Sequence, residues 1–456
     1  MTDAPLELTS AQRRHPRHWR HILAALLAFA LGSIAINFTA TRASNGTAIQ
    51  DGFASGALET ITPVDLAPWW LVARAQLDCQ QLMPLVSGNL TVGAAIARPQ
   101  FALADRKVNA CVLLASAVER KRLSGNMREV SRRDGFHTAG SLTLPAMAML
   151  GVAATRWASA LILLGATACG LWFICTAPAM GGRRDRIAAT ACMMGAAAFI
   201  LAIPGSLTAI PTIALLVVSL VGILIALRKH GAAPDSLYVA APFMAAALVS
   251  LDPAGGSVPV GLGCMMLLAR MVAPTAADRP VVLRTAVLYM LTVLLCWFTY
   301  AALVGVTSGW NYAALVLRDQ LMDTREAGRI GDFIAGATGT YKWLSGENLL
   351  GPLGAFDLLF TVLFGLMIYA AVEPLHPRAG RLEPLMTALL AVAPVVLWAL
   401  LYPGDWRRAE EQYVLPLMWL IAIAMAGPFV LLIEFARRVA RRRPASPAPA
   451  KATSVA

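Results

Sequence analysis

Residues 13–38 read RRHPRHWRHILAALLAFALGSIAINF, in which four arginines are followed by an apolar run without a charged residue. A run of this kind approaches the ~20 residues that a helix needs to cross a ~30 Å hydrocarbon core. Similar runs recur along most of the chain, which is 58% hydrophobic and 14% charged with a mean hydropathy of +0.63. Because only helices can satisfy their backbone groups inside lipid, the sequence predicts an all-α polytopic integral membrane protein.

The apolar runs predict about ten transmembrane helices, with edges accurate to roughly four residues. They lie near 22–38, 157–179, 187–205, 208–227, 237–251, 258–274, 283–304, 355–373, 385–402 and 413–434. The fifth and sixth are short, so they could form a tight hairpin or a re-entrant pair. The run 139–153 is too short to cross alone and is interpreted as an interfacial or re-entrant segment.

The basic clusters give the orientation. With ten spans, they all fall on one face, which the positive-inside rule assigns to the cytoplasm. They are Arg13, Arg14, Arg17 and Arg20; Arg183, Arg184 and Arg186; Arg228 and Lys229; Arg270 and Arg279; Arg378 and Arg381; and Arg437, Arg438 and Arg441 to Arg443. Topology therefore accounts for the net charge of +12 better than a nucleic-acid partner, and no nucleic-acid binding is expected.

The predicted organisation follows from these spans. A cytoplasmic segment 1–21 precedes the first helix at 22–38, an extracytoplasmic loop covers 39–156, a helical bundle with an outer loop 305–354 covers 157–434, and a basic disordered tail covers 435–456. The first apolar run could alternatively be a cleaved signal peptide, but its length favours retention as a span. The expected location is a plasma membrane of the bacterial inner-membrane type, in contact with membrane lipids.

The long outer loop contains two stretches with apolar residues at helical spacing, 70–86 and 110–123, which predict amphipathic helices at the membrane surface. Two of the seven cysteines, Cys79 and Cys111, lie in this loop. An oxidising compartment makes a disulfide between them the expected state.

Several site classes lack a motif. No CxxC pair or His/Cys ligand spacing predicts a metal site. No Walker loop, GxGxxG or GxSxG is present, so ATP-driven, dinucleotide-dependent and serine-hydrolase functions have no support, and no cofactor is expected.

What remains is a set of acidic and basic residues on the predicted outer face. The acids of the first loop include Asp51, Asp78 and Asp134, with His137 shortly after the last of them. The later outer segments contribute the arginines Arg325 and Arg329 and, in YPGDWRRAEEQY (402–413), Arg407 and Arg408. Taken singly, each can be an ordinary solvated loop charge, and nearby acids can neutralise the last pair.

The arrangement resembles the GT-C superfamily of membrane glycosyltransferases. The shared features are many helical spans, a cytoplasmic N-terminus, a long first outer loop with amphipathic helices, and an acidic residue soon after the first span. The first loop has QDG (50–52) where that superfamily commonly has an acidic pair. The resemblance implies transfer of a sugar from a polyprenyl-phosphate donor at the outer face, without a Rossmann domain.

Within this hypothesis, Asp51 is the first choice for the general base, because its neighbour Gly52 permits a tight turn and the first span is close. Asp78, Asp134 and His137 are substitutes. The four arginines named above are candidates for binding the donor phosphate. Two alternatives stay open: a polymerase or ligase that joins lipid-linked oligosaccharides, and a transporter or non-catalytic membrane subunit, which the lack of an internal repeat disfavours.

Overall fold

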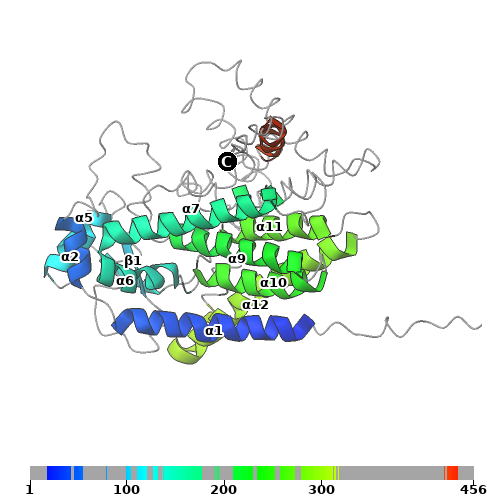
Figure 1. Cartoon of the computed structure of the whole chain (residues 1–456). Helices are drawn as coiled ribbons and strands as arrows, with labels where there is room; N and C mark the ends of the chain where they lie inside the picture. The colour runs from blue at the N-terminus through cyan, green and yellow to red at the C-terminus, as the bar shows by residue number, and fades with distance from the viewer. Residues whose placement is uncertain are drawn as a thin grey trace, which may run out of the picture.

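The computed structural model describes residues 18–42, 46–54, 79, 99–103, 110–120, 127–131, 136, 138–176, 189–190, 193–194, 209–229, 234–251, 257–272, 279–311, 313–314, 317, 426 and 429–439. These residues are almost entirely helical (Figure 1). The elements, in chain order, are α1 (His18–Arg42), α2 (Gly46–Ala54), β1 (Pro99–Leu103), α5 (Ala110–Arg120), β2 (Met127–Ser131), α6 (Thr138–Leu150), α7 (Val152–Thr176), α9 (Ala209–Lys229), α10 (Pro234–Leu251), α11 (Ser257–Val272) and α12 (Arg279–Ser308).

Among the described residues, four helices are long and apolar enough to cross a membrane. Their candidate spans are His18–Thr39, Val152–Ile174, Pro234–Leu251 and Pro280–Thr307, and shorter apolar stretches lie in α6, α9 and α11. These helices coincide with the first, second, fifth and seventh predicted spans. The eighth and ninth predicted spans lie outside the described residues.

Three of the long helices run in the same direction. At their N-terminal ends, the rings of His18 in α1 and Tyr238 in α10 are 4.9 Å apart, and the guanidinium of Arg284 in α12 lies 5.6 Å from the Tyr238 ring. Near the other end, the hydroxyls of Ser33 in α1 and Ser250 in α10 are 2.7 Å apart. Alternating spans predict this shared direction for the first, fifth and seventh crossings.

The core is centred on α10, which packs against α1, α9, α11 and α12. Small side chains, such as Ala241 and Ala245, let neighbouring helices approach closely, as is common between helices in lipid. Gly261 of α11 lies at another close approach, since a Cβ there would lie 2.6 Å from the hydroxyl oxygen of Tyr289. That hydroxyl donates a hydrogen bond of 2.7 Å to the carbonyl of Val258.

By contrast, α1 and α7 expose most of their apolar surface within the described part of the chain. In α1 the exposed residues Trp19, Leu23, Leu27 and Leu31 recur every four positions and form one stripe. A continuous apolar stripe on a long helix suits contact with lipid.

The apolar run 139–153 forms α6 and the start of α7. A single residue, Gly151, joins the two helices with φ at 77°, a left-handed conformation that glycine adopts without steric cost. The amide of Gly151 donates to the carbonyl of Met147 at 2.8 Å, and the hydroxyl of Thr155 donates to the carbonyl of Gly151 at 2.7 Å. Thus α7 begins at Val152, inside the predicted outer loop, rather than at 157.

A two-stranded antiparallel sheet adds a feature that the sequence did not predict. Strands β1 and β2 pair from Pro99↔Ser131 to Leu103↔Met127. Together with α2, α5 and α6 they gather at one end of the long helices (Figure 1).

Candidate functional site

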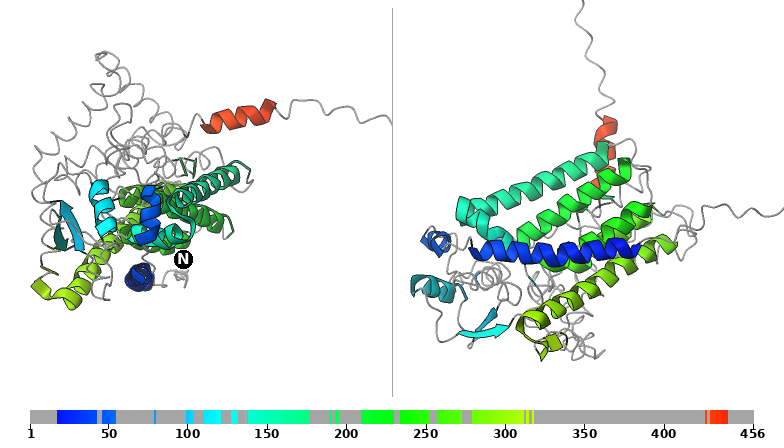
Figure 2. Two further views of the ribbon diagram at one scale, coloured as in Figure 1. Left: turned by 90° about the vertical axis from the view of Figure 1, so that its left-hand side faces the viewer. Right: turned by 90° about the horizontal axis from the view of Figure 1, so that it is seen from below.

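Asp51 lies on α2, which begins four residues after the end of α1. Ile49 and Gly52 are buried, whereas Gln50, Asp51 and Ala54 are exposed, so the short helix is amphipathic. It packs against α5, α6 and α7, and in the left view of Figure 2 it lies across the direction of α1. The tight turn considered for Asp51 is wrong, because the residue is helical. A helix of nine residues is too short to be stable alone, and burial of Ile49 and Gly52 against neighbouring helices stabilises it.

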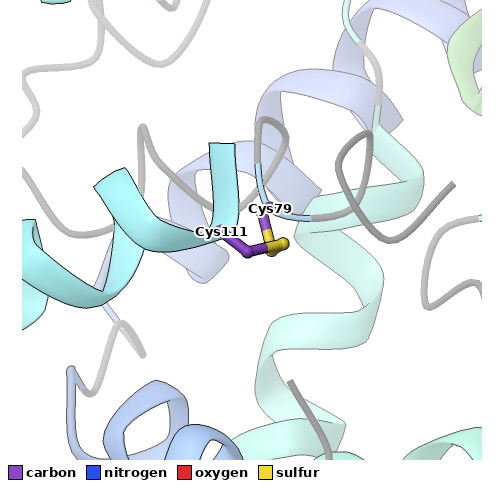
Figure 3. Close-up of a disulfide and its surroundings, with 2 residues drawn as sticks. All are labelled: Cys79 and Cys111. Atoms are coloured by element: carbon purple, nitrogen blue, oxygen red, sulfur yellow. A yellow bond between two sulfur atoms is a disulfide. The ribbon is translucent and has the colours of Figure 1, made fainter. Parts of the chain in front are cut away.

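The cysteines of the predicted outer loop form a disulfide (Figure 3). The sulfur atoms of Cys79 and Cys111 are 2.03 Å apart and the Cα atoms 5.1 Å apart. Both residues are buried, and Cys111 is the second residue of α5, which lies inside the predicted helical stretch 110–123. The bond therefore fastens Cys79 to α5, a helix on which α2 packs.

A cluster of buried hydroxyls forms where α6 meets α10 end to end. The Thr138 hydroxyl, in the first turn of α6, donates to the carbonyl of Ser250 in the last turn of α10 at 2.9 Å, and the two side-chain oxygens are also 2.9 Å apart. Ser33 of α1 completes the cluster through its 2.7 Å contact with the Ser250 hydroxyl. Because the last carbonyls of a helix have no partner within it, the Thr138 hydroxyl supplies a hydrogen-bond donor that the helix itself does not provide.

The residues around this cluster connect the start of α6 to a second position on α1 and to α12. The Ser141 hydroxyl donates to the side-chain oxygen of Asn37 in α1 at 2.6 Å. Phe136, just before α6, packs edge-on against Phe29 of α1 at 5.3 Å and Tyr300 of α12 at 4.8 Å. We refer to residues Phe136, Thr138 and Ser141 as the anchor segment, since together they contact α1, α10 and α12.

The structure places only part of the predicted site. Asp51 and the disulfide are described, whereas the other candidates lie outside the described residues: Asp78, Asp134, His137, Arg325, Arg329, Arg407 and Arg408. Within the described residues, no group of three or more His, Cys, Asp or Glu side chains is arranged to hold a metal ion.

The anchor segment and its partners were missed by sequence analysis. One signal was available: Ser33 and Asn37 are polar residues four positions apart in the first apolar run, and thus lie on one helix face. A polar pair of this kind within a span predicts a polar contact with another segment of the protein.

Comparison with known proteins identifies no relative. No protein-family model, no curated protein and no solved structure matches the chain.

Proposed function

We propose that this chain is a membrane glycosyltransferase that moves a sugar from a polyprenyl-phosphate donor to an acceptor at the outer face of a bacterial inner membrane, in envelope polysaccharide or glycolipid assembly. The observation that carries the proposal is the position of Asp51. Its carboxylate is exposed on a short amphipathic helix packed on the predicted outer end of the bundle. A carboxylate there can meet the headgroup of a lipid-linked substrate.

The chemistry requires few groups. The acceptor oxygen attacks the anomeric carbon of the sugar while the bond from that carbon to the donor phosphate breaks. Asp51 takes the acceptor proton as general base, and the polyprenyl phosphate leaves with the bonding electrons. Arginines of the predicted outer loops, Arg407 and Arg408 first and then Arg325 and Arg329, would bind the phosphate and stabilise its charge.

The distribution of acids in the described spans supports chemistry at the interface over transport. Transporters commonly place ionisable residues near the middle of the membrane. Helices α1, α7 and α12 contain no acidic residue, and Asp235 of α10 is in its first turn. The shared direction of α1, α10 and α12 supports the ten-span topology, which the proposal also includes.

The test is a pair of matched carboxylate-to-amide substitutions. Asp51→Asn preserves the shape of the side chain and removes its basicity, so transfer should fall at least ~100-fold, as expected for a lost general base. Glu119→Gln makes the same chemical change at an exposed position on α5 and should leave the rate within about twofold. The assay uses purified protein in lipid nanodiscs, a panel of radiolabelled polyprenyl-phosphate sugars, and release of polyprenyl phosphate.

The outcomes separate the alternatives. A normal rate in Asp51→Asn with normal yield would move the general base to Asp78 or Asp134. Products that are lengthened oligosaccharides on the lipid would indicate a polymerase or ligase. A wild-type protein that transfers no sugar from any donor, but accumulates a solute in proteoliposomes, would reject the proposal in favour of transport.

A further inference from the structure

We infer that Thr138 and Ser250 are positioning residues for Asp51: their hydrogen bonds fix the start of α6, and α6 in turn holds the helix α2 that carries the carboxylate. The inference rests on the proposed function for its catalytic part. Its structural part, that the junction of α6 with α10 controls the placement of α2, can be tested without any substrate.

The helix α2 depends on its neighbours for stability. A nine-residue helix is too short to be stable alone, so α2 needs the surface on which it packs. That surface comprises α5, α6 and α7. On its own side, α2 contributes the fully buried side chain of Ile49. A movement of α6 and the adjoining start of α7 would therefore change the position of Asp51.

The helix α6 is fixed at its start. This helix has 13 residues, with Pro145 inside it, and it exposes the large apolar side chains of Leu142, Met149 and Leu150. Its side chain Met147 is fully buried, and the helix packs against α1, α7, α9 and α10. Its start, however, is the anchor segment, where Phe136 packs between α1 and α12 and Thr138 bonds to α10.

The end of α10 needs a hydrogen-bond donor from outside its own helix. Ser250 and Leu251, the last two residues of α10, are buried among the described residues. A carbonyl at a buried helix end that loses its donor is costly to leave without a partner. Thr138 supplies the donor for the Ser250 carbonyl. Without that hydroxyl, separation of the two helix ends becomes favourable, because it lets other donors reach the carbonyl. A shift of α6 would then displace α2, which packs on it.

The chain offers a matched control. Thr138 and Thr292 are both fully buried threonines in helices. The hydroxyl of Thr292 donates to the carbonyl of Leu288 in its own helix at 2.7 Å, whereas that of Thr138 reaches a residue 112 positions away. Thr138→Val and Thr292→Val remove the same group with the same shape change, and Thr138→Ser keeps the hydroxyl.

The experiment measures hydrogen–deuterium exchange by mass spectrometry on the full chain in nanodiscs. In Thr138→Val, exchange in peptide 46–54 should rise at least about fivefold while α12 stays unchanged, because opening is local. Thr138→Ser should restore exchange to within about twofold of wild type, and Thr292→Val should not alter it. With transferase assays, kcat should fall about tenfold in Thr138→Val at nearly constant KM, since misplacement of a catalytic group costs rate.

Three results would overturn the inference: unchanged exchange at 46–54 in Thr138→Val, an equal rise throughout α12 that marks general loosening, or failure of Thr138→Ser to restore wild-type behaviour. A wild-type protein without transferase activity would reject the proposed function. The exchange comparison would still accept or reject the placement of α2 by the junction.

Discussion

Replacing Gly261 with alanine should destabilise the protein by forcing apart the contact between α11 and α12. A methyl group there would lie 2.4 Å from Cδ1 of Leu248 and 2.6 Å from the hydroxyl oxygen of Tyr289. Carbon atoms in contact are ordinarily about 3.5–4.0 Å apart. The end of the leucine side chain can rotate away, but the buried tyrosine is fixed by its hydrogen bond to Val258.

The magnitude follows from three terms. Inserting a methyl group into a packed core costs about 1–3 kcal/mol. Breaking the tyrosine hydrogen bond and leaving its groups buried costs a further 1–3 kcal/mol or so, if the ring must shift. The higher helix propensity of alanine returns up to ~1 kcal/mol. We therefore expect a net loss of about 1–5 kcal/mol in the free energy of unfolding.

The assay is unfolding in mixed micelles, followed by circular dichroism, with two comparisons. Gly222→Ala in α9 is the control, since nothing lies within 4 Å of an added Cβ; it should be neutral or stabilising by up to ~1 kcal/mol. Tyr289→Phe removes one of the two atoms that the new methyl meets, so Gly261→Ala should cost at least ~0.5 kcal/mol less in that background. If Gly261→Ala and Gly222→Ala are equally stable, the close approach of α11 and α12 described above is incorrect.

The remaining predictions concern the predicted outer face. Cys79 and Cys111 should resist alkylation until reductant is added, and replacing both with serine should cost about 3–4 kcal/mol by the loop-entropy model, measured by thermal unfolding; free thiols in the oxidised protein would contradict this. A reporter enzyme fused after residue 330 should behave as extracytoplasmic, and a cytoplasmic signal there would reject the ten-span topology. Arg407→Lys or Arg408→Lys should weaken donor binding several-fold, because lysine keeps the charge but loses the bidentate fork; normal binding and turnover in the double alanine variant would reduce the pair to a solvated turn.

Hydropathy predicted those helices whose identity depends on their own composition. The predicted spans 22–38 and 283–304 lie inside α1 and α12, because a long, predominantly apolar run must form a helix in lipid whatever its neighbours are. The run 237–251 is short, and its sequence fits either a full span or a re-entrant segment. In the structure it forms α10, which is a candidate span of 18 residues.

Features that depend on distant partners were not predictable from local patterns. The nine residues of α2 contain Gly46 and Gly52, which suggest a turn, and only packing makes them helical. Likewise β1 and β2 each have five residues, and their pairing joins segments that show no strong alternation of apolar and polar residues. The sequence therefore located the carboxylate of Asp51 near the first span but gave it the wrong local conformation.

The junction of α6 with α10 has a consequence for how the protein is made. Its partners Thr138 and Ser250 are 112 residues apart in the chain. A ribosome adding about 5–20 residues per second would need roughly 6–22 s to synthesise that interval. During that time α6 has already been synthesised, but Ser250, whose carbonyl accepts the hydrogen bond from Thr138, has not. During those seconds the start of α6 lacks its partner in α10, so this segment depends on water, headgroups or an insertion factor until α10 has been inserted.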